Sequence, residues 1–167
     1  RDAAQAVNAA AVVFEEPLWS QNPRLRQMVL LRWADNLEGQ LDYLANLLTQ
    51  ENGKVIGQSR GEVLAAISEI RYYAGLTRFM PGHVFEVEPG IFSTILKEPA
   101  GVAGIVVPWN APAVLLIRSL APALAAGCTA VVKPAAQTSL ITAALIRELS
   151  NADGCLPGVI NLLNEFG

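Results

Sequence analysis

The sequence is short of the residues that build metal sites and disulfide frameworks. Its 167 residues include one histidine, His83, and two cysteines, Cys128 and Cys155. Neither cysteine has a histidine or a group of metal-ligand residues near it in the chain, and two cysteines are too few for a disulfide framework. We therefore expect no metal site, two structural cysteines, and a reducing compartment, the cytoplasm.

Charge is also scarce, and no apolar run is long. Charged residues make up 16% of the chain, hydrophobic residues 52%, and the formal net charge is −3. This balance gives no electrostatic reason to expect nucleic acid or an anionic membrane surface as a partner. A membrane-spanning helix needs ~20 consecutive apolar residues. The most apolar stretch, residues 102–132, is interrupted by Pro108, Asn110, Pro112, Arg118, Pro122 and Gly127.

That apolar stretch has the pattern of a strand, a helix and a second strand. Val102–Val107 and Thr129–Val132 are rich in β-branched residues, and Pro or Gly bounds each of them. Between them, Ala113–Ala126 is long enough for a helix and ends at Gly127, a typical residue for a helix C-terminus. Short turns between these elements predict a βαβ unit with two parallel strands, each buried on both faces.

Such a unit binds ligands at the carboxyl ends of its strands. The first predicted strand ends at Pro108-Trp109-Asn110 and the second at Lys133-Pro134. An amide, an indole and a cation should therefore lie along one edge of the sheet. A buried βαβ unit without a site remains the alternative, because strand ends often carry Pro, Asn and Lys for structural reasons.

The N-terminal half of the chain reads as helical. Apolar periodicity predicts a helix over Asp2–Phe14, a long amphipathic helix over Arg24–Leu48 with an interruption near Gly39, and a helix from about Gln58 to Phe79. The segment Glu51–Lys54 has Asn-Gly at its centre and predicts a turn. We expect the aromatic residues at helical spacing to belong to the core rather than to a binding cage. These residues are Trp19, Trp33, Tyr72 and Tyr73.

Two extended segments follow, and the chain then returns to the βαβ pattern. Val84–Glu88 and Ile91–Lys97 flank Pro89-Gly90, which predicts a hairpin or two linked arms. Apolar residues on both sides of the second arm require cover on both sides. After the βαβ unit, Ser139–Leu149 predicts a second crossover helix and Val159–Leu163 a third strand beside the other two.

Four blocks, PWNAP, APALAAG, TAVVKPAAQT and LPGVINLL, resemble in order and spacing the cofactor-binding half of the aldehyde dehydrogenase superfamily. The helical region with LTQENGK and RYYAG resembles the same family, so the likeness covers nearly the whole chain. It implies an α/β fold with a helical region at 1–82, a hairpin or oligomerisation arm at 83–100, and the first βαβαβ half of a Rossmann-like NAD(P)-binding sheet at 101–167. The catalytic domain of the family is absent.

The resemblance also implies roles for individual residues. Asn110 matches the family's oxyanion-hole asparagine, and Lys133 its lysine that contacts the adenosine ribose or a 2′-phosphate. The other implied cofactor-binding positions are Val106, Val107, Pro108, Trp109, Ala136 and Gly167. The expected cofactor is NAD or NADP and the expected substrate an aldehyde, oxidised to a carboxylic acid through a thiohemiacetal.

The sequence departs from the family and from other dinucleotide-binding proteins in three ways. It contains no G-x-G-x-x-G motif. Ala136 stands where many members carry a glutamate, and a carboxylate there would disfavour a 2′-phosphate. The nucleophilic cysteine and general-base glutamate of the family have no counterparts in the chain.

Two hypotheses therefore follow. The chain is expected to be the N-terminal part of an NAD(P)-dependent aldehyde dehydrogenase, inactive alone, which associates with its missing C-terminal part or with copies of itself. The start at Arg1, without a Met or a signal-peptide pattern, favours this hypothesis. The alternative is a short non-catalytic module that uses the same fold for nucleotide binding or oligomerisation.

Overall fold

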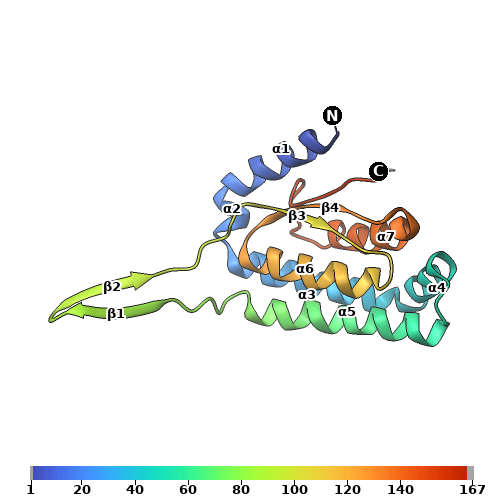
Figure 1. Cartoon of the computed structure of the whole chain (residues 1–167), viewed down its shortest axis with the longest axis horizontal. Coiled ribbons are helices and arrows are strands. Elements are labelled where there is room, and N and C mark those ends of the chain that lie inside the picture. Colours follow the sequence, from blue (N-terminus) through green and yellow to red (C-terminus); the bar gives the residue numbers. More distant parts are fainter. Residues whose placement is uncertain (1, 165–167) are drawn as a thin grey trace.

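The computed structural model describes residues 2–164, in which helices form the N-terminal half and a small sheet with two helices forms the C-terminal half (Figure 1). A separate hairpin lies between them in the sequence. The elements are α1 (Asp2–Glu15), α2 (Pro17–Ser20), α3 (Pro23–Gly39), α4 (Leu41–Asn52), α5 (Ile56–Leu76), β1 (His83–Glu88), β2 (Ile91–Ile95), β3 (Val102–Val106), α6 (Pro112–Ala126), β4 (Thr129–Lys133), the 3-10 turn η1 (Ala136–Thr138), α7 (Ser139–Ser150) and β5 (Ile160–Leu162).

All of the predicted helices are present, with shifted ends. The predicted long helix over 24–48 is two helices, α3 and α4, which separate at Gln40, next to the expected interruption at Gly39. Helix α3 begins with Pro23, and the side chain of Asn22 accepts a hydrogen bond from the Leu25 amide at 3.0 Å, which satisfies a free donor of the first turn. Gly53, at φ 81°, ends α4 in the left-handed conformation that glycine adopts without strain.

The C-terminal sheet has the predicted parallel topology. Its order is β3-β4-β5, with Val102 opposite Thr129, Val106 opposite Lys133, and Ala130 opposite Ile160. Helix α6 connects the first pair of strands and α7 the second. Because β4 lies in the middle, β3 is at an edge of the sheet among the described residues.

The expectation that both strands of the βαβ unit are buried on both faces is wrong for β3. Strand β4 is buried from Thr129 to Val132, since α6 packs on one face and α1 contacts it from the other, as the layers in Figure 1 show. In β3 only Ile105 is buried, whereas Gly104 and Val106 are exposed. The edge position explains the difference: within residues 2–164 no strand lies along the outer side of β3, and α1 covers β3 less than it covers β4.

Behind the sheet, α6 and α7 pack against α3, and α5 packs against both α3 and α6. The indoles of Trp19 and Trp33 are fully buried there, and each donates a hydrogen bond from Nε1 to a backbone carbonyl, of Cys128 at 3.0 Å and of Leu145 at 2.9 Å. The prediction that the aromatic residues are core is therefore right for both tryptophans. It is wrong for Tyr72, which is 61% exposed on α5.

A buried arginine joins the ends of two helices. Arg26 is only 4% exposed, and its guanidinium donates to the carbonyls of Trp19, Ser20 and Ala125 at 2.8, 2.8 and 3.2 Å. These carbonyls lie at the C-termini of α2 and α6, where the helix dipoles favour a cation. Burial lowers the pKa of Arg26 from its usual value.

The hairpin β1–β2 extends away from the rest of the molecule (Figure 1). The two strands pair in antiparallel fashion, from His83 opposite Ile95 to Glu88 opposite Ile91, as one of the two predicted alternatives had it. Every residue of both strands is exposed, including Phe85 and Phe92. Within residues 2–164, no helix is both long enough and apolar enough to cross a membrane.

Candidate functional site

The candidate site lies at the edge of the sheet where β3 and β4 end. Because Val106 stands opposite Lys133 in the parallel register, the turn that follows β3 lies beside Lys133. The Val107 amide continues the pairing by donating to the Lys133 carbonyl at 2.9 Å. The structure thus brings the two predicted strand ends together at one edge.

The turn from Pro108 to Ala111 connects β3 to α6 without regular secondary structure. Pro108, Trp109 and Asn110 are all exposed, with Trp109 at 57%. Val106 is 78% exposed and Val107 is buried, so only one of these two predicted cofactor-binding valines presents its side chain at the surface.

The other predicted positions follow β4. Lys133 is half-buried at the end of the strand, and Ala136 is exposed at the start of η1, directly before α7. Gly167 lies outside the described residues. The described positions therefore form a continuous edge that runs from the Asn110 turn to the N-terminus of α7.

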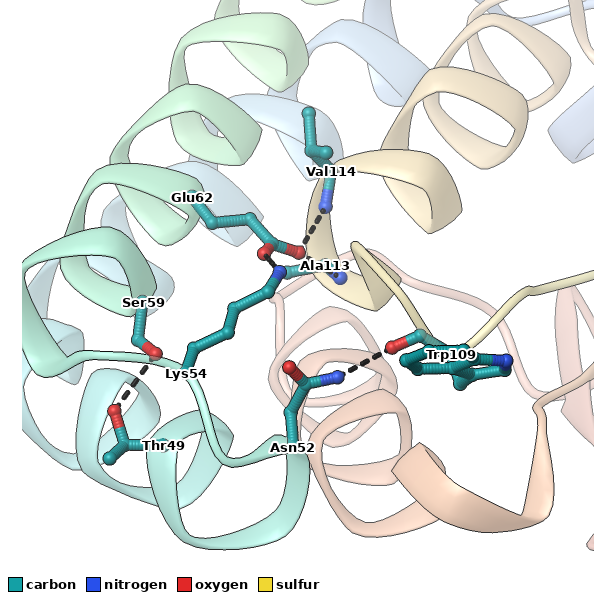
Figure 2. Close-up of polar contacts among 8 residues, drawn as sticks. All are labelled: Thr49, Asn52, Lys54, Ser59, Glu62, Trp109, Ala113 and Val114. Carbon is teal, nitrogen blue, oxygen red and sulfur yellow. Dashed lines mark hydrogen bonds and ion pairs between the residues drawn. The ribbon is translucent and has the colours of Figure 1, made fainter.

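A carboxylate from a distant helix binds the N-terminus of α6. Oε1 of Glu62, on α5, accepts hydrogen bonds from the amides of Ala113 at 2.9 Å and Val114 at 3.3 Å (Figure 2). Ala111, at the N-cap of α6, has no side-chain oxygen to do this. The other carboxylate oxygen pairs with the Lys54 ammonium, and the Glu62 side chain is only 8% exposed. A buried carboxylate is stable here because a cation, two amide donors and the helix dipole all oppose its charge.

The N-terminus of α7 is bound in the same way. Glu51, in the last turn of α4, accepts from the amides of Leu140 at 2.7 Å and Ile141 at 2.8 Å. Its neighbour Asn52 donates from Nδ2 to the carbonyl of Trp109 at 2.6 Å (Figure 2). The last turn of α4 thus contacts both segments that follow the strands.

Sequence reasoning identified Glu51–Lys54 only as a turn and did not single out Glu62. The signal available in the sequence was an acid, an amide and a base around one glycine. The partners of Glu51 and Asn52 are 57 to 90 positions away along the chain, and the amides that Glu62 binds are 51 and 52 positions away. No spacing rule connects residues across such distances.

These contacts bear on phosphate binding. In the usual dinucleotide fold, a pyrophosphate binds the free amides at the N-terminus of the first crossover helix. In this chain a protein carboxylate already occupies these amides in α6, and another does so in α7. A phosphate at either position would have to displace a negative side chain. This arrangement agrees with the absence of a G-x-G-x-x-G motif.

The two cysteines are free, and neither belongs to this edge. Cys128 is buried directly before β4, and Cys155 is half-buried after α7. Burial raises the pKa of Cys155 to about 11, so its thiol is protonated and weakly nucleophilic at neutral pH. In residues 2–164, no group of three or more His, Cys, Asp or Glu side chains is arranged to hold a metal ion.

The model of the aldehyde dehydrogenase family matches residues 1–167. The chain belongs to the aldehyde dehydrogenase family. It is 40% identical over 167 residues to aldehyde dehydrogenase 1 of Tanacetum cinerariifolium, a match that covers 97% of this chain and 33% of that protein. It is 39% identical over 139 residues to a succinate-semialdehyde dehydrogenase [NADP(+)] of Schizosaccharomyces pombe, with 83% and 28% covered.

Solved structures of the family share its fold. Betaine aldehyde dehydrogenase from Staphylococcus aureus, in complex with NAD+, superposes with a TM-score of 0.91 at 33% identity, over 97% of this chain and 32% of that one. The fold is therefore that of the N-terminal part of an aldehyde dehydrogenase. The chain spans about a third of the length of the curated relatives that it matches.

Proposed function

We propose that this chain is the N-terminal part of an NAD(P)-dependent aldehyde dehydrogenase and contributes the first half of its cofactor-binding domain. The observation that supports this most directly is the shared edge at the ends of β3 and β4. It brings the turn containing Asn110 next to Lys133, in a chain that belongs to this family. The nucleophile and the general base would come from the remainder of the protein.

In this proposal the edge of the sheet binds the cofactor, and Asn110 stabilises the negative charge that develops during the reaction. Val106, Val107, Pro108 and Trp109 line the cofactor, while Lys133 contacts its ribose or 2′-phosphate. When bound, the nicotinamide accepts the hydride as the aldehyde and water become a carboxylic acid and a proton. Asn110 donates an N–H hydrogen bond to the former carbonyl oxygen as negative charge develops there, and one such donor is worth roughly 3 kcal/mol.

Replacing Asn110 in the complete protein tests the assignment. Asn110→Ala should lower kcat by about 100-fold, because the oxyanion loses its donor. The KM for the cofactor should stay within about twofold, since the donor acts on the transition state. A kcat close to that of the original protein would exclude Asn110 as the oxyanion donor.

The residue at position 136 bears on cofactor choice. Ala136 is exposed three positions after Lys133 and brings no carboxylate to the ribose. We expect the complete protein to accept NADP as well as NAD, and Ala136→Glu to shift the ratio of kcat/KM values toward NAD by about tenfold. An unchanged ratio would mean that position 136 is not at the ribose.

The exposed hairpin β1–β2 is expected to bind another protein surface. Its apolar residues on both faces are the kind of surface that another chain covers, and we propose that it joins this protein to copies of itself or to its remaining part in the cytoplasm. The same hairpin is the observation that favours the second candidate, a short non-catalytic module for oligomerisation or nucleotide binding.

The two candidates differ in the mass of the natural product. The intact mass of the protein made from its own gene should exceed that of these 167 residues if it is a dehydrogenase subunit. A mass-verified sample of this chain alone should not turn over aldehydes with NAD or NADP, because it carries no assigned nucleophile. A natural product of this length, folded and inactive, would favour the module instead.

A further inference from the structure

The candidate oxyanion donor lies in a turn that has neither regular secondary structure nor a side-chain cap of its own. Asn110 is exposed in the middle of the turn between β3 and α6, and Ala111 provides no side-chain cap for the helix that follows. Pro112, the first residue of α6, has no N–H. Since a hydrogen-bond donor accelerates a reaction only when it is fixed before the charge develops, something else must fix this turn.

Two side chains, one from the last turn of α4 and one from α5, hold the backbone on either side of Asn110. Asn52 donates from Nδ2 to the carbonyl of Trp109 at 2.6 Å, and this carbonyl belongs to the peptide group that leads into Asn110 (Figure 2). On the other side, Glu62 accepts from the Ala113 amide at 2.9 Å. The backbone is thus held one residue before and three residues after the donor.

An ion pair with Lys54 also fixes the Glu62 carboxylate. Lys54 pairs with the second oxygen of Glu62, and both side chains are well covered, at 19% and 8% exposed. Figure 2 shows the Lys54 side chain reaching alongside α5 to this carboxylate, with Asn52 below it aimed at Trp109. Removal of the Glu62 carboxylate would therefore free the first turn of α6 and leave a partly buried cation without its partner.

From these contacts we infer that Glu62 and Asn52 are positioning residues for the oxyanion donor Asn110. Glu62 fixes the N-terminus of α6, and Asn52 fixes the peptide before Asn110. Neither touches the reacting atoms. The inference rests on the proposed role of Asn110 and adds to it the residues that determine where its side-chain amide is held.

Glu51 supplies a matched control. It binds the N-terminus of α7 with the same chemistry, through the Leu140 and Ile141 amides, and within residues 2–164 no hydrogen bond joins it to the Asn110 turn. Loss of either carboxylate removes two hydrogen bonds at a helix N-terminus. Glu62→Ala in addition leaves Lys54 without its partner and should therefore cost more stability. A purely structural role predicts that each variant loses kcat in proportion to its loss of melting temperature.

The experiment measures kcat, the KM for the cofactor and the melting temperature in the complete protein. Glu62→Ala should lower kcat by about 10-fold to 100-fold, as small misplacements of catalytic groups do, and leave the cofactor KM within about twofold. Asn52→Asp keeps the shape but replaces the donor by an acceptor, and should lower kcat in the same direction. Glu51→Ala should also lower the melting temperature, though by less than Glu62→Ala because no buried cation loses its partner, while kcat changes by less than about twofold.

A double-substitution cycle separates positioning from general damage. If Glu62 acts through Asn110, then Glu62→Ala should lower kcat by less than about twofold in the Asn110→Ala background. Glu62→Gln, which keeps an acceptor oxygen, should recover most of the lost kcat, and it replaces Glu62→Ala if that variant does not fold.

Equal losses of kcat from Glu62→Ala in both backgrounds would overturn the inference, and so would equal losses from Glu62→Ala and Glu51→Ala. If Asn110→Ala lowers kcat but Glu62→Ala does not, only the positioning role is wrong. If Asn110→Ala leaves kcat unchanged, the proposed role of Asn110 fails first, and the positioning role fails with it.

Discussion

Strand β4 and the hairpin β1–β2 are built from similar residues and have opposite surroundings. Ala130, Val131 and Val132 of β4 are at most 7% exposed, whereas Val84, Phe92 and the other apolar residues of the hairpin strands are at least 49% exposed. The difference comes from the layers. Strand β4 has a strand on each side and helices against both faces, whereas within residues 2–164 each strand of the hairpin pairs only with the other. An isolated two-stranded hairpin is marginally stable in water, so its stability depends on what covers it.

The comparison implies that the two regions respond differently to mutation. In the sheet-and-helix body, a large side chain contributes to the free energy of unfolding of this chain. In the hairpin, an equally large side chain contributes chiefly to association with another surface. Three predictions test this division.

The largest effect is expected in the body. Trp33→Ala should lower the free energy of unfolding by about 3–5 kcal/mol, because a fully buried indole leaves a cavity and the Leu145 carbonyl loses its donor. Urea unfolding followed by circular dichroism measures it. Tyr72→Ala, at a 61% exposed aromatic residue on the outer side of α5, is the control and should cost less than about 1 kcal/mol.

A smaller effect on stability is expected at Gly127, where the C-terminus of α6 lies against the C-terminus of α2. Gly127 has φ 107°, and an added Cβ would lie 2.8 Å from the Ser20 carbonyl oxygen and 3.3 Å from the Arg26 guanidinium carbon. Gly127→Ala should therefore lower the free energy of unfolding by about 2 kcal/mol. At Gly39, by contrast, a Cβ meets nothing within 4 Å, so Gly39→Ala should leave the unfolding curve nearly unchanged. Equal effects of the two substitutions would show that the Ser20 contact does not matter.

The smallest effect on stability is expected in the hairpin. Replacing Phe85 and Phe92 by serine should change the free energy of unfolding of the monomeric chain by less than about 0.5 kcal/mol, because both rings are already in water. The same double variant should reduce self-association, as measured by light scattering over a range of concentrations. The unsubstituted chain is expected to associate, since it also exposes the edge of β3.

A well-folded monomer at micromolar concentration would contradict the association part of this comparison. It would mean that neither the hairpin nor the β3 edge needs a partner. A large loss of stability in the Phe85 and Phe92 double variant would contradict the other part, because it would make the hairpin a cooperative element of the body.

Sequence reasoning succeeded where the signal is local. The β-branched runs, the prolines and Gly127 predicted the βαβ unit, and the parallel rule predicted the order of the three strands. It also predicted that Lys133 and the Asn110 turn share an edge. It was less accurate for helix ends, since the helix predicted from about Gln58 to Phe79 runs from Ile56 to Leu76. It failed for Tyr72, because helical periodicity does not say how much of a helix its neighbours cover.

The sequence by itself determined the elements, their order in the sheet and the candidate residues at its edge, because periodicity, turn chemistry and the handedness of crossovers act over short stretches of chain. Only the tertiary structure decided which helix N-termini are already occupied. Glu51, Asn52 and Glu62 reach segments more than fifty positions away because α4 and α5 pack beside α7 and α6. Such contacts depend on how helices pack side by side, which no local pattern records. For that reason, the residues that hold the Asn110 turn became visible only in the folded molecule.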